Sequence, residues 1–190
     1  MSSLNADFDS LLGRIKHGRD LDYASAEPVF YLVFQPQHIL AVKRELPAWT
    51  SRLKNDGFTV EVFSIAEHIE DILRSSPVFK IWENADKKTP LAWGKTNRSL
   101  ANEINKGELQ NRIAEKLSQL AEQKNGILLV TDLEALHPYI RIGTIEGGLL
   151  GKFSVPTVFF YPGERTGSTQ LKFLGCYPED GNYRSVHVGG

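Results

Sequence analysis

The chain has few of the residues that mark secreted, metal-thiolate or nucleic-acid-binding proteins. Only one of its 190 residues is a cysteine, Cys176, so neither an internal disulfide nor a zinc site of several thiolates can form. The formal net charge is −1, without the surplus of Lys and Arg that broad attraction to nucleic acid requires. No apolar run approaches the roughly 20 residues of a membrane helix. Because the N-terminus is polar and unlike a secretory signal, we expect a cytoplasmic protein that makes no membrane contact.

The sequence also lacks a recognisable catalytic set. Its five histidines are scattered, and no two of them have the spacing of metal ligands. There is no G-x-S-x-G motif, which would place a nucleophilic serine on a sharp turn. The lone Cys176 follows an apolar run, where a cysteine is most often a packing residue. We therefore predict no catalytic residues, no metal and no cofactor.

The sequence has no phosphate-binding loop, although one predicted strand ends in acidic residues, as one strand of P-loop ATPases does. Residues 127–131 are apolar and precede Asp132 and Glu134, and acids at such a strand end hold magnesium in those enzymes. A working site also needs G-x-x-x-x-G-K-[ST] after the first strand. Here Val29–Phe34 is followed by Gln-Pro-Gln-His at 35–38, without glycine or lysine. We therefore interpret Asp132 and Glu134 as a vestigial acidic strand end.

Apolar runs bounded by Gly, Pro or polar residues predict the strands of an α/β domain. Four longer strands and two short ones are expected, at residues 29–34, 58–65, 127–131, 156–161, 171–174 and 184–188. The Pro-Gly-Glu-Arg sequence at 162–165 is predicted to be a turn, so that the strand ends before it and before Asp132 open onto the same rim.

Helical periodicity separates these strands. We expect helices at residues 7–16, 37–55, 66–75 and 97–124. Asp7 is the expected N-cap of the first, Pro47 should bend or break the second, and Lys106-Gly107 should interrupt the last. Strands joined by helices are usually parallel. The prediction is a three-layer α/β fold with a mostly parallel central sheet and helices on both faces, resembling a degenerate P-loop NTPase core without its phosphate loop.

The whole chain, 1–190, is expected to form one domain, with an N-terminal helix and connector at 1–27 and the α/β core at 28–190. Within it, residues 76–95 show the least regular pattern. They contain the large apolar residues Phe79, Ile81, Trp82 and Trp93 in a polar setting. Either the segment is a lid packed on the core, or it is a partner-binding surface, since Trp is enriched at interface hot spots.

Three arginines stand near predicted strand or loop ends. Arg141 follows the acidic strand end, Arg165 follows the Pro-Gly sequence and Arg184 follows Tyr183. One interpretation is that all three are solvated or salt-bridged. The other is a cationic contact surface for a protein carboxylate or a phosphate, because a guanidinium makes bidentate contacts.

Several of these segments, in this order and spacing, resemble the BrxB family of the bacterial BREX anti-phage systems. They are L-V-T-D-L-E-A-L-H-P at 129–138, I-R at 140–141, V-P-T-V-F-F-Y-P-G at 155–163, L-K-F-L-G at 171–175 and Y-R at 183–184. The resemblance implies a small component of a multi-gene defence system that methylates host DNA and blocks phage DNA replication. It also implies companions, first among them PglZ, an alkaline-phosphatase-like protein.

Three hypotheses of function follow. The leading one is a non-enzymatic adaptor that binds another BREX protein, with the candidate contacts Trp82, Trp93, Arg141, Arg165, Tyr183 and Arg184. The second is a nucleic-acid-binding module in which Arg141, Lys152, Arg165 and Lys172 cluster near one rim. The third is a residual nucleotide-binding enzyme that uses Asp132 and Glu134 with a divalent metal.

Overall fold

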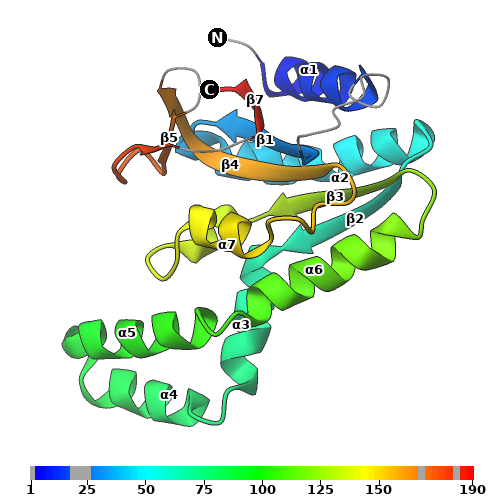
Figure 1. Cartoon of the computed structure of the whole chain (residues 1–190). Helices are drawn as coiled ribbons and strands as arrows, with labels where there is room; N and C mark the ends of the chain where they lie inside the picture. The colour runs from blue at the N-terminus through cyan, green and yellow to red at the C-terminus, as the bar shows by residue number, and fades with distance from the viewer. Residues whose placement is uncertain (1–2, 18–26, 167–169, 182–184) are drawn as a thin grey trace.

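A parallel β-sheet forms the centre of the protein. The computed structural model describes residues 3–17, 27–166, 170–181 and 185–190. Neighbouring strands are parallel in the order β2 (Thr59–Ser64), β3 (Gly126–Thr131), β4 (Thr157–Thr166), β1 (Val29–Phe34) and β7 (Val186–Gly189). The predicted mostly parallel sheet is therefore confirmed (Figure 1).

Helices cover both faces of this sheet. Side chains alternate along β1, so that Phe30, Leu32 and Phe34 face one layer and Tyr31 and Val33 face the other. The first layer contains α1 (Leu4–His17) and α2 (Ile39–Asn55), and the second contains α3 (Ile65–Ser75), α6 (Glu108–Ala121), η3 (Leu133–Leu136) and α7 (Ile142–Gly148). The predicted three-layer arrangement is confirmed.

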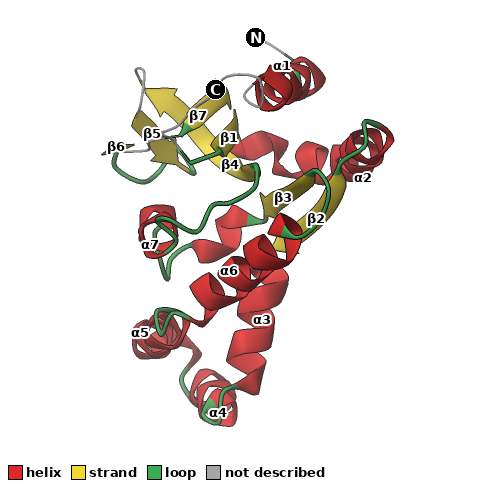
Figure 2. Ribbon diagram, turned by 45° about the vertical axis from the view of Figure 1, so that its right-hand side comes forward, coloured by secondary structure: helices red, strands yellow, loops and turns green. Residues whose placement is uncertain are grey.

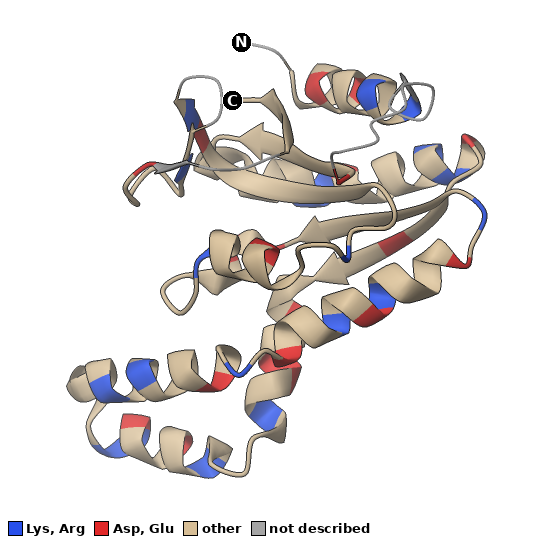
Figure 3. Ribbon diagram, viewed as in Figure 1, with Lys and Arg blue, Asp and Glu red and all other residues tan. Residues whose placement is uncertain are grey.

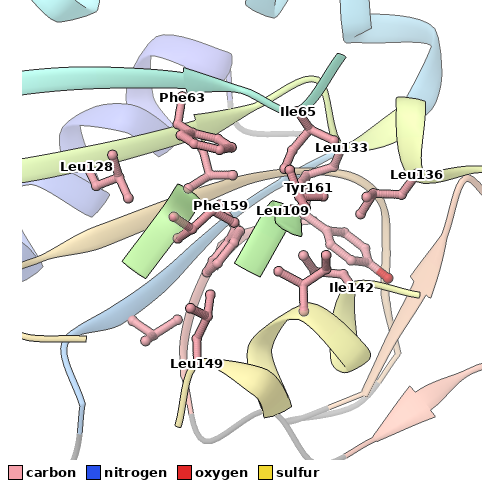
Figure 4. Close-up of a cluster of buried hydrophobic side chains, with 14 of the residues drawn as sticks. Phe63, Ile65, Leu109, Leu128, Leu133, Leu136, Ile142, Leu149, Phe159 and Tyr161 are labelled. Carbon is pink, nitrogen blue, oxygen red and sulfur yellow. The ribbon is translucent and has the colours of Figure 1, made fainter. Parts of the chain in front are cut away.

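The second layer holds the larger of the two cores. Figure 4 shows Phe159 and Tyr161 of β4 among side chains from η3, α6 and α7. The Phe159 and Tyr31 rings stack with their centroids 5.2 Å apart. Each large apolar side chain buried in this way contributes about 1.5–3 kcal/mol to folding, so this cluster holds the helices firmly on the sheet.

The predicted turn at 162–165 is wrong, because β4 continues through it. Beyond its parallel pairing with β1, the strand pairs antiparallel with β5 (Gln170–Phe173), and β5 pairs with β6 (Asp180–Gly181). Pro162 lies opposite Phe34 of β1, and its carbonyl accepts the Leu174 N–H at 2.9 Å. Position 163 requires glycine because the β5 backbone passes close to it, and a Cβ there would lie 2.3 Å from the Lys172 carbonyl oxygen.

Each of the four predicted helical segments is helical, with two differences in detail, and the structure adds η3, α7 and the helices between residues 79 and 92, which the sequence analysis did not predict. Asp7 is not the N-cap of α1, because the helix begins at Leu4 and the Ser3 hydroxyl accepts the Ala6 N–H at 3.2 Å. Pro47 does not break α2, which continues from Ile39 to Asn55. The expected interruption before α6 is confirmed, since Gly107 has a φ of +92°. Residues 18–26 of the expected connector and Arg184 of the expected last strand lie outside the described residues.

The segment expected to be irregular forms a helical hairpin. It consists of α4 (Phe79–Lys88), the short η2 (Pro90–Ala92) and α5 (Trp93–Ile104). Figures 1 and 2 show the two helices side by side beyond the end of α3, projecting away from the sheet. The interpretation of this segment as a lid over the core is therefore wrong. Only the end of α5 reaches the core, where Ile104 is fully buried.

Candidate functional site

Four element ends meet at the carboxyl edge of the sheet and bring opposite charges together. Lys43, one turn into α2, places its ammonium nitrogen 2.6 Å from Asp132 Oδ1 and 2.8 Å from Glu134 Oε1. The Ser64 hydroxyl at the end of β2 donates to Asp132 Oδ2 at 2.7 Å, and the Thr131 hydroxyl does so at 2.9 Å. We call Lys43, Ser64, Thr131, Asp132 and Glu134 the charged edge.

These contacts stabilise the ionised forms of both partners. Burial alone would raise the pKa of Asp132, but hydrogen bonds from Lys43, Ser64 and Thr131 outweigh burial and hold this pKa below its ordinary value. Burial likewise opposes the charge on Lys43, and its bonds to Asp132 and Glu134 raise the pKa above its ordinary value. The Asp132 side chain is 16% exposed and that of Lys43 is 47% exposed, so the pair lies at the protein–water boundary.

A small cavity of about 170 Å³ lies beside the charged edge. Its remaining lining is apolar and comes from Phe34, Ile39, Val42, Leu46 and Phe160. Pockets for small-molecule ligands are usually about 300–1,000 Å³. In the described part of the chain, no group of three or more His, Cys, Asp or Glu side chains could hold a metal ion. The Lys43 ammonium already forms ion pairs with both carboxylates that the sequence analysis singled out, and it balances one of their two negative charges.

Sequence reasoning found Asp132 and Glu134 but missed Lys43. A signal was available, because a lysine near the start of the helix after β1 lies at the same sheet edge as the acids that follow β3. The ion pair between Lys43 and these acids, however, could be predicted only with the strand order known, because β4 lies between β1 and β3 in the sheet.

Arg141 is held by an aromatic ring. Its guanidinium carbon lies 4.0 Å from the centre of the Tyr177 ring, and the Tyr177 hydroxyl makes a hydrogen bond with the His137 ring. Burial raises the pKa of Tyr177 above its ordinary value, against the opposing effect of Arg141. Arg141 is half-buried in this cluster, so it is a less accessible contact than the sequence suggested.

One of the other basic candidates, Lys152, does not lie at the rim that carries Arg141, whose partner Tyr177 contacts the end of β5. Arg165 and Lys172 lie on the antiparallel extension formed by β4 and β5, whereas Lys152 precedes the opposite end of β4. At about 3.3 Å per residue, the strand from Thr157 to Arg165 separates these ends by about 26 Å. The expected cluster of four basic residues is therefore wrong. Tyr183 and Arg184 lie outside the described residues.

The two tryptophans of the hairpin have different environments. Trp82 is 6% exposed, and its indole N–H donates to the Ser99 hydroxyl of α5 at 2.9 Å. It joins the two helices and is buried, so it is not at the surface as the sequence analysis expected. Trp93 is 62% exposed, beside Leu91 at 93%. All ten residues from 86 to 95 are exposed, and we call this stretch the hairpin tip.

The architecture defines a mixed α/β protein with a mostly parallel sheet. The family model described as BREX protein BrxB matches residues 62–188, from within β2 to within β7, and so covers the acidic strand end and the hairpin. The chain belongs to the BrxB family. It is therefore a component of a BREX system, which provides antiviral defence and phage resistance, and BrxB has no known catalytic role.

Neither a comparison with curated proteins nor one with solved structures found a match. Among the helices of the described residues, none is both long and apolar enough to cross a membrane.

Proposed function

We propose that the protein is a non-enzymatic adaptor of a cytoplasmic BREX complex. It binds another BREX component, with PglZ as the first candidate, and thereby supports host DNA methylation and phage restriction. The observation that carries this proposal is the exposure of Leu91 and Trp93 on a hairpin that projects from the sheet.

The hairpin has the properties of a recognition element rather than of ordinary surface. Three of its large apolar side chains, Ile81, Leu91 and Trp93, are exposed, out of only six such residues in the described chain. Single exposed apolar residues need no explanation, but three of them on one hairpin support its assignment as an interaction site. Trp is among the residues whose removal most weakens protein interfaces.

We further infer that the core is a degenerate P-loop NTPase core. The acids after β3 support this inference, as does the replacement of a phosphate loop by η1 (Pro36–His38) directly after β1. Where an active enzyme of that class holds a metal ion, Lys43 forms ion pairs with Asp132 and Glu134. The proposal therefore assigns the charged edge a structural role and predicts no nucleotide turnover.

The test is size-exclusion chromatography with light scattering, on the protein alone and mixed with each purified BREX component. A stable complex, first with PglZ, is the expected result, and failure to form a complex with any component would contradict the adaptor role. A nucleic-acid-binding module has less support, because Lys152 lies at the opposite end of β4 from Arg165 and Lys172, and the net charge is −1. Electrophoretic mobility of DNA should therefore stay unchanged at low salt.

A further inference from the structure

We propose that the hairpin tip, residues 86–95, inserts into an apolar pocket bordered by Asp and Glu side chains on the partner protein. This inference rests on the proposed adaptor function and adds to it the docking element, its anchors and the chemistry of the partner's surface. Leu91 and Trp93 would fill the pocket, and the basic residues around them would contact its acidic border.

The anchors are exposed although the same hairpin buries another tryptophan. Trp82 satisfies its indole N–H and is covered by α5, whereas Trp93 begins α5 and faces solvent. Leu91 lies in η2, between the two helices, and is the most exposed of the large apolar residues in the described chain. An aliphatic and an aromatic side chain two residues apart form a compact anchor that fits a concave apolar site.

The charge around the anchors indicates an acidic border. Residues 86–98 contain Lys87, Lys88, Lys95 and Arg98 against the single acid Asp86, a formal charge of +3 on a protein whose total is −1. Within the described residues, none of these four cations forms an ion pair, whereas Lys43, Arg112 and Lys116 elsewhere each contact a carboxylate. Figure 3 shows the basic residues along α4 and α5. Complementary charge would accelerate association and orient the two proteins.

The hairpin is also preorganised for binding. The Thr89 amide and hydroxyl both hydrogen-bond to the Ala85 carbonyl, at 2.9 and 3.0 Å, and this closes the end of α4 before the tip. Buried Thr96 and Ile104 fix α5 on its inner side. A tip held in this way loses little conformational entropy on docking, so a few anchor contacts suffice for affinity.

The same features disfavour other ligands. Single-stranded nucleic acid is held by several stacked aromatic residues along a basic groove, and Trp93 is the only aromatic residue in the tip. An interfacial membrane helix presents a long apolar face, whereas the apolar anchors here are confined to η2 and the start of α5. A protein pocket matches both the size of the anchors and the charge around them.

The experiment measures binding of the full chain to each purified BREX component by biolayer interferometry, at two salt concentrations. Leu91→Ala and Trp93→Ala should each weaken the complex by at least about 10-fold, mainly through faster dissociation. The double variant Lys87→Glu/Lys88→Glu should slow association and remove most of its salt dependence. The matched controls are Leu40→Ala, another exposed leucine, on α2, and Lys54→Glu, both expected to bind within about twofold of the wild type.

The outcomes separate the two proposals. If the wild type binds no component, the adaptor function fails, and this inference fails with it. If a complex forms and the tip variants bind like the wild type, the adaptor function stands and the docking site is wrong. Loss of binding to DNA or to anionic vesicles, rather than to a protein, in the Trp93→Ala variant would also overturn the inference. Unchanged circular dichroism would confirm that each variant is folded.

Discussion

The charged edge and the hairpin tip differ in whether their side chains find partners within the chain. At the charged edge, Asp132 accepts hydrogen bonds from three side chains and Glu134 shares the same lysine. At the tip, Leu91, Trp93 and the surrounding cations have no such partners among the described residues. The polar groups of the site that resembles an enzyme in sequence are therefore paired within the chain, whereas the segment without a motif exposes apolar and basic side chains that are unpaired in the described part of the chain.

The largest expected effect separates the two tryptophans of the hairpin. Trp82→Ala should lower the free energy of unfolding by about 3–5 kcal/mol, because it leaves a cavity between α4 and α5 and an unpaired Ser99 hydroxyl. Trp93→Ala should change it by no more than about 0.5 kcal/mol, since the side chain is exposed. Denaturant unfolding measures both. Equal losses of stability in the two variants would contradict the conclusion that Trp82 is packed between the helices and Trp93 is exposed.

A smaller loss of stability is expected at the charged edge. Lys43→Met removes the cation shared by Asp132 and Glu134 and should lower the free energy of unfolding by about 1–2 kcal/mol, a value reduced because Lys43 is half exposed. Lys54→Met on the same helix serves as the control, because Lys54 forms no ion pair among the described residues. If both variants unfold alike, the pairing at the charged edge does not stabilise the fold.

The sequence predicted the strands β1 and β3 because each is a continuous apolar run buried on both faces. It failed where a distant partner decides the structure. The Pro-Gly pair in β4 has the composition of a turn, and pairing with β1 at Pro162 and with β5 at Gly163 keeps it extended. Likewise, the counter-ion of Asp132 lies on α2, which no local pattern connects to β3.

Local sequence pattern also could not predict which side chains of the hairpin are exposed. Trp82 and Trp93 stand in similar mixtures of polar and apolar residues, so the sequence cannot tell which of them is covered. Trp82 donates its indole N–H to Ser99 on α5. Ser99 reaches it because the chain reverses direction at η2. The candidate contact surface therefore required the three-dimensional arrangement.

The stabilisation that the Lys43 ion pair provides should decrease at both low and high pH. The lowered pKa of Asp132 means that its contribution is present above the unfolded value of about 3.9 and is lost as pH falls through the folded pKa. The raised pKa of Lys43 means that its contribution is present below the unfolded value of about 10.4 and is lost as pH rises through the folded pKa. The stability difference between wild type and Lys43→Met should therefore be largest near neutral pH and shrink towards both limits. A constant difference would exclude this ion pair as its origin.

The smallest expected effect is that of added nucleotide. Magnesium with ATP should shift the melting temperature of the wild type by less than about 1 °C, because a ligand stabilises a protein only when it binds the folded state. Thermal melts with and without MgATP make the measurement. A shift of several degrees that disappears in Asp132→Ala would mean that the charged edge binds nucleotide, and the contrast between the two regions would fail.

Hydrogen exchange with mass spectrometry tests the central contrast most directly, on the protein alone and in complex with the BREX component that it binds. We predict that the complex slows amide exchange in peptides that contain residues 86–95 and leaves exchange at residues 131–136 unchanged. Slower exchange at 131–136, with no change at the hairpin tip, would contradict the account and place the partner at the charged edge.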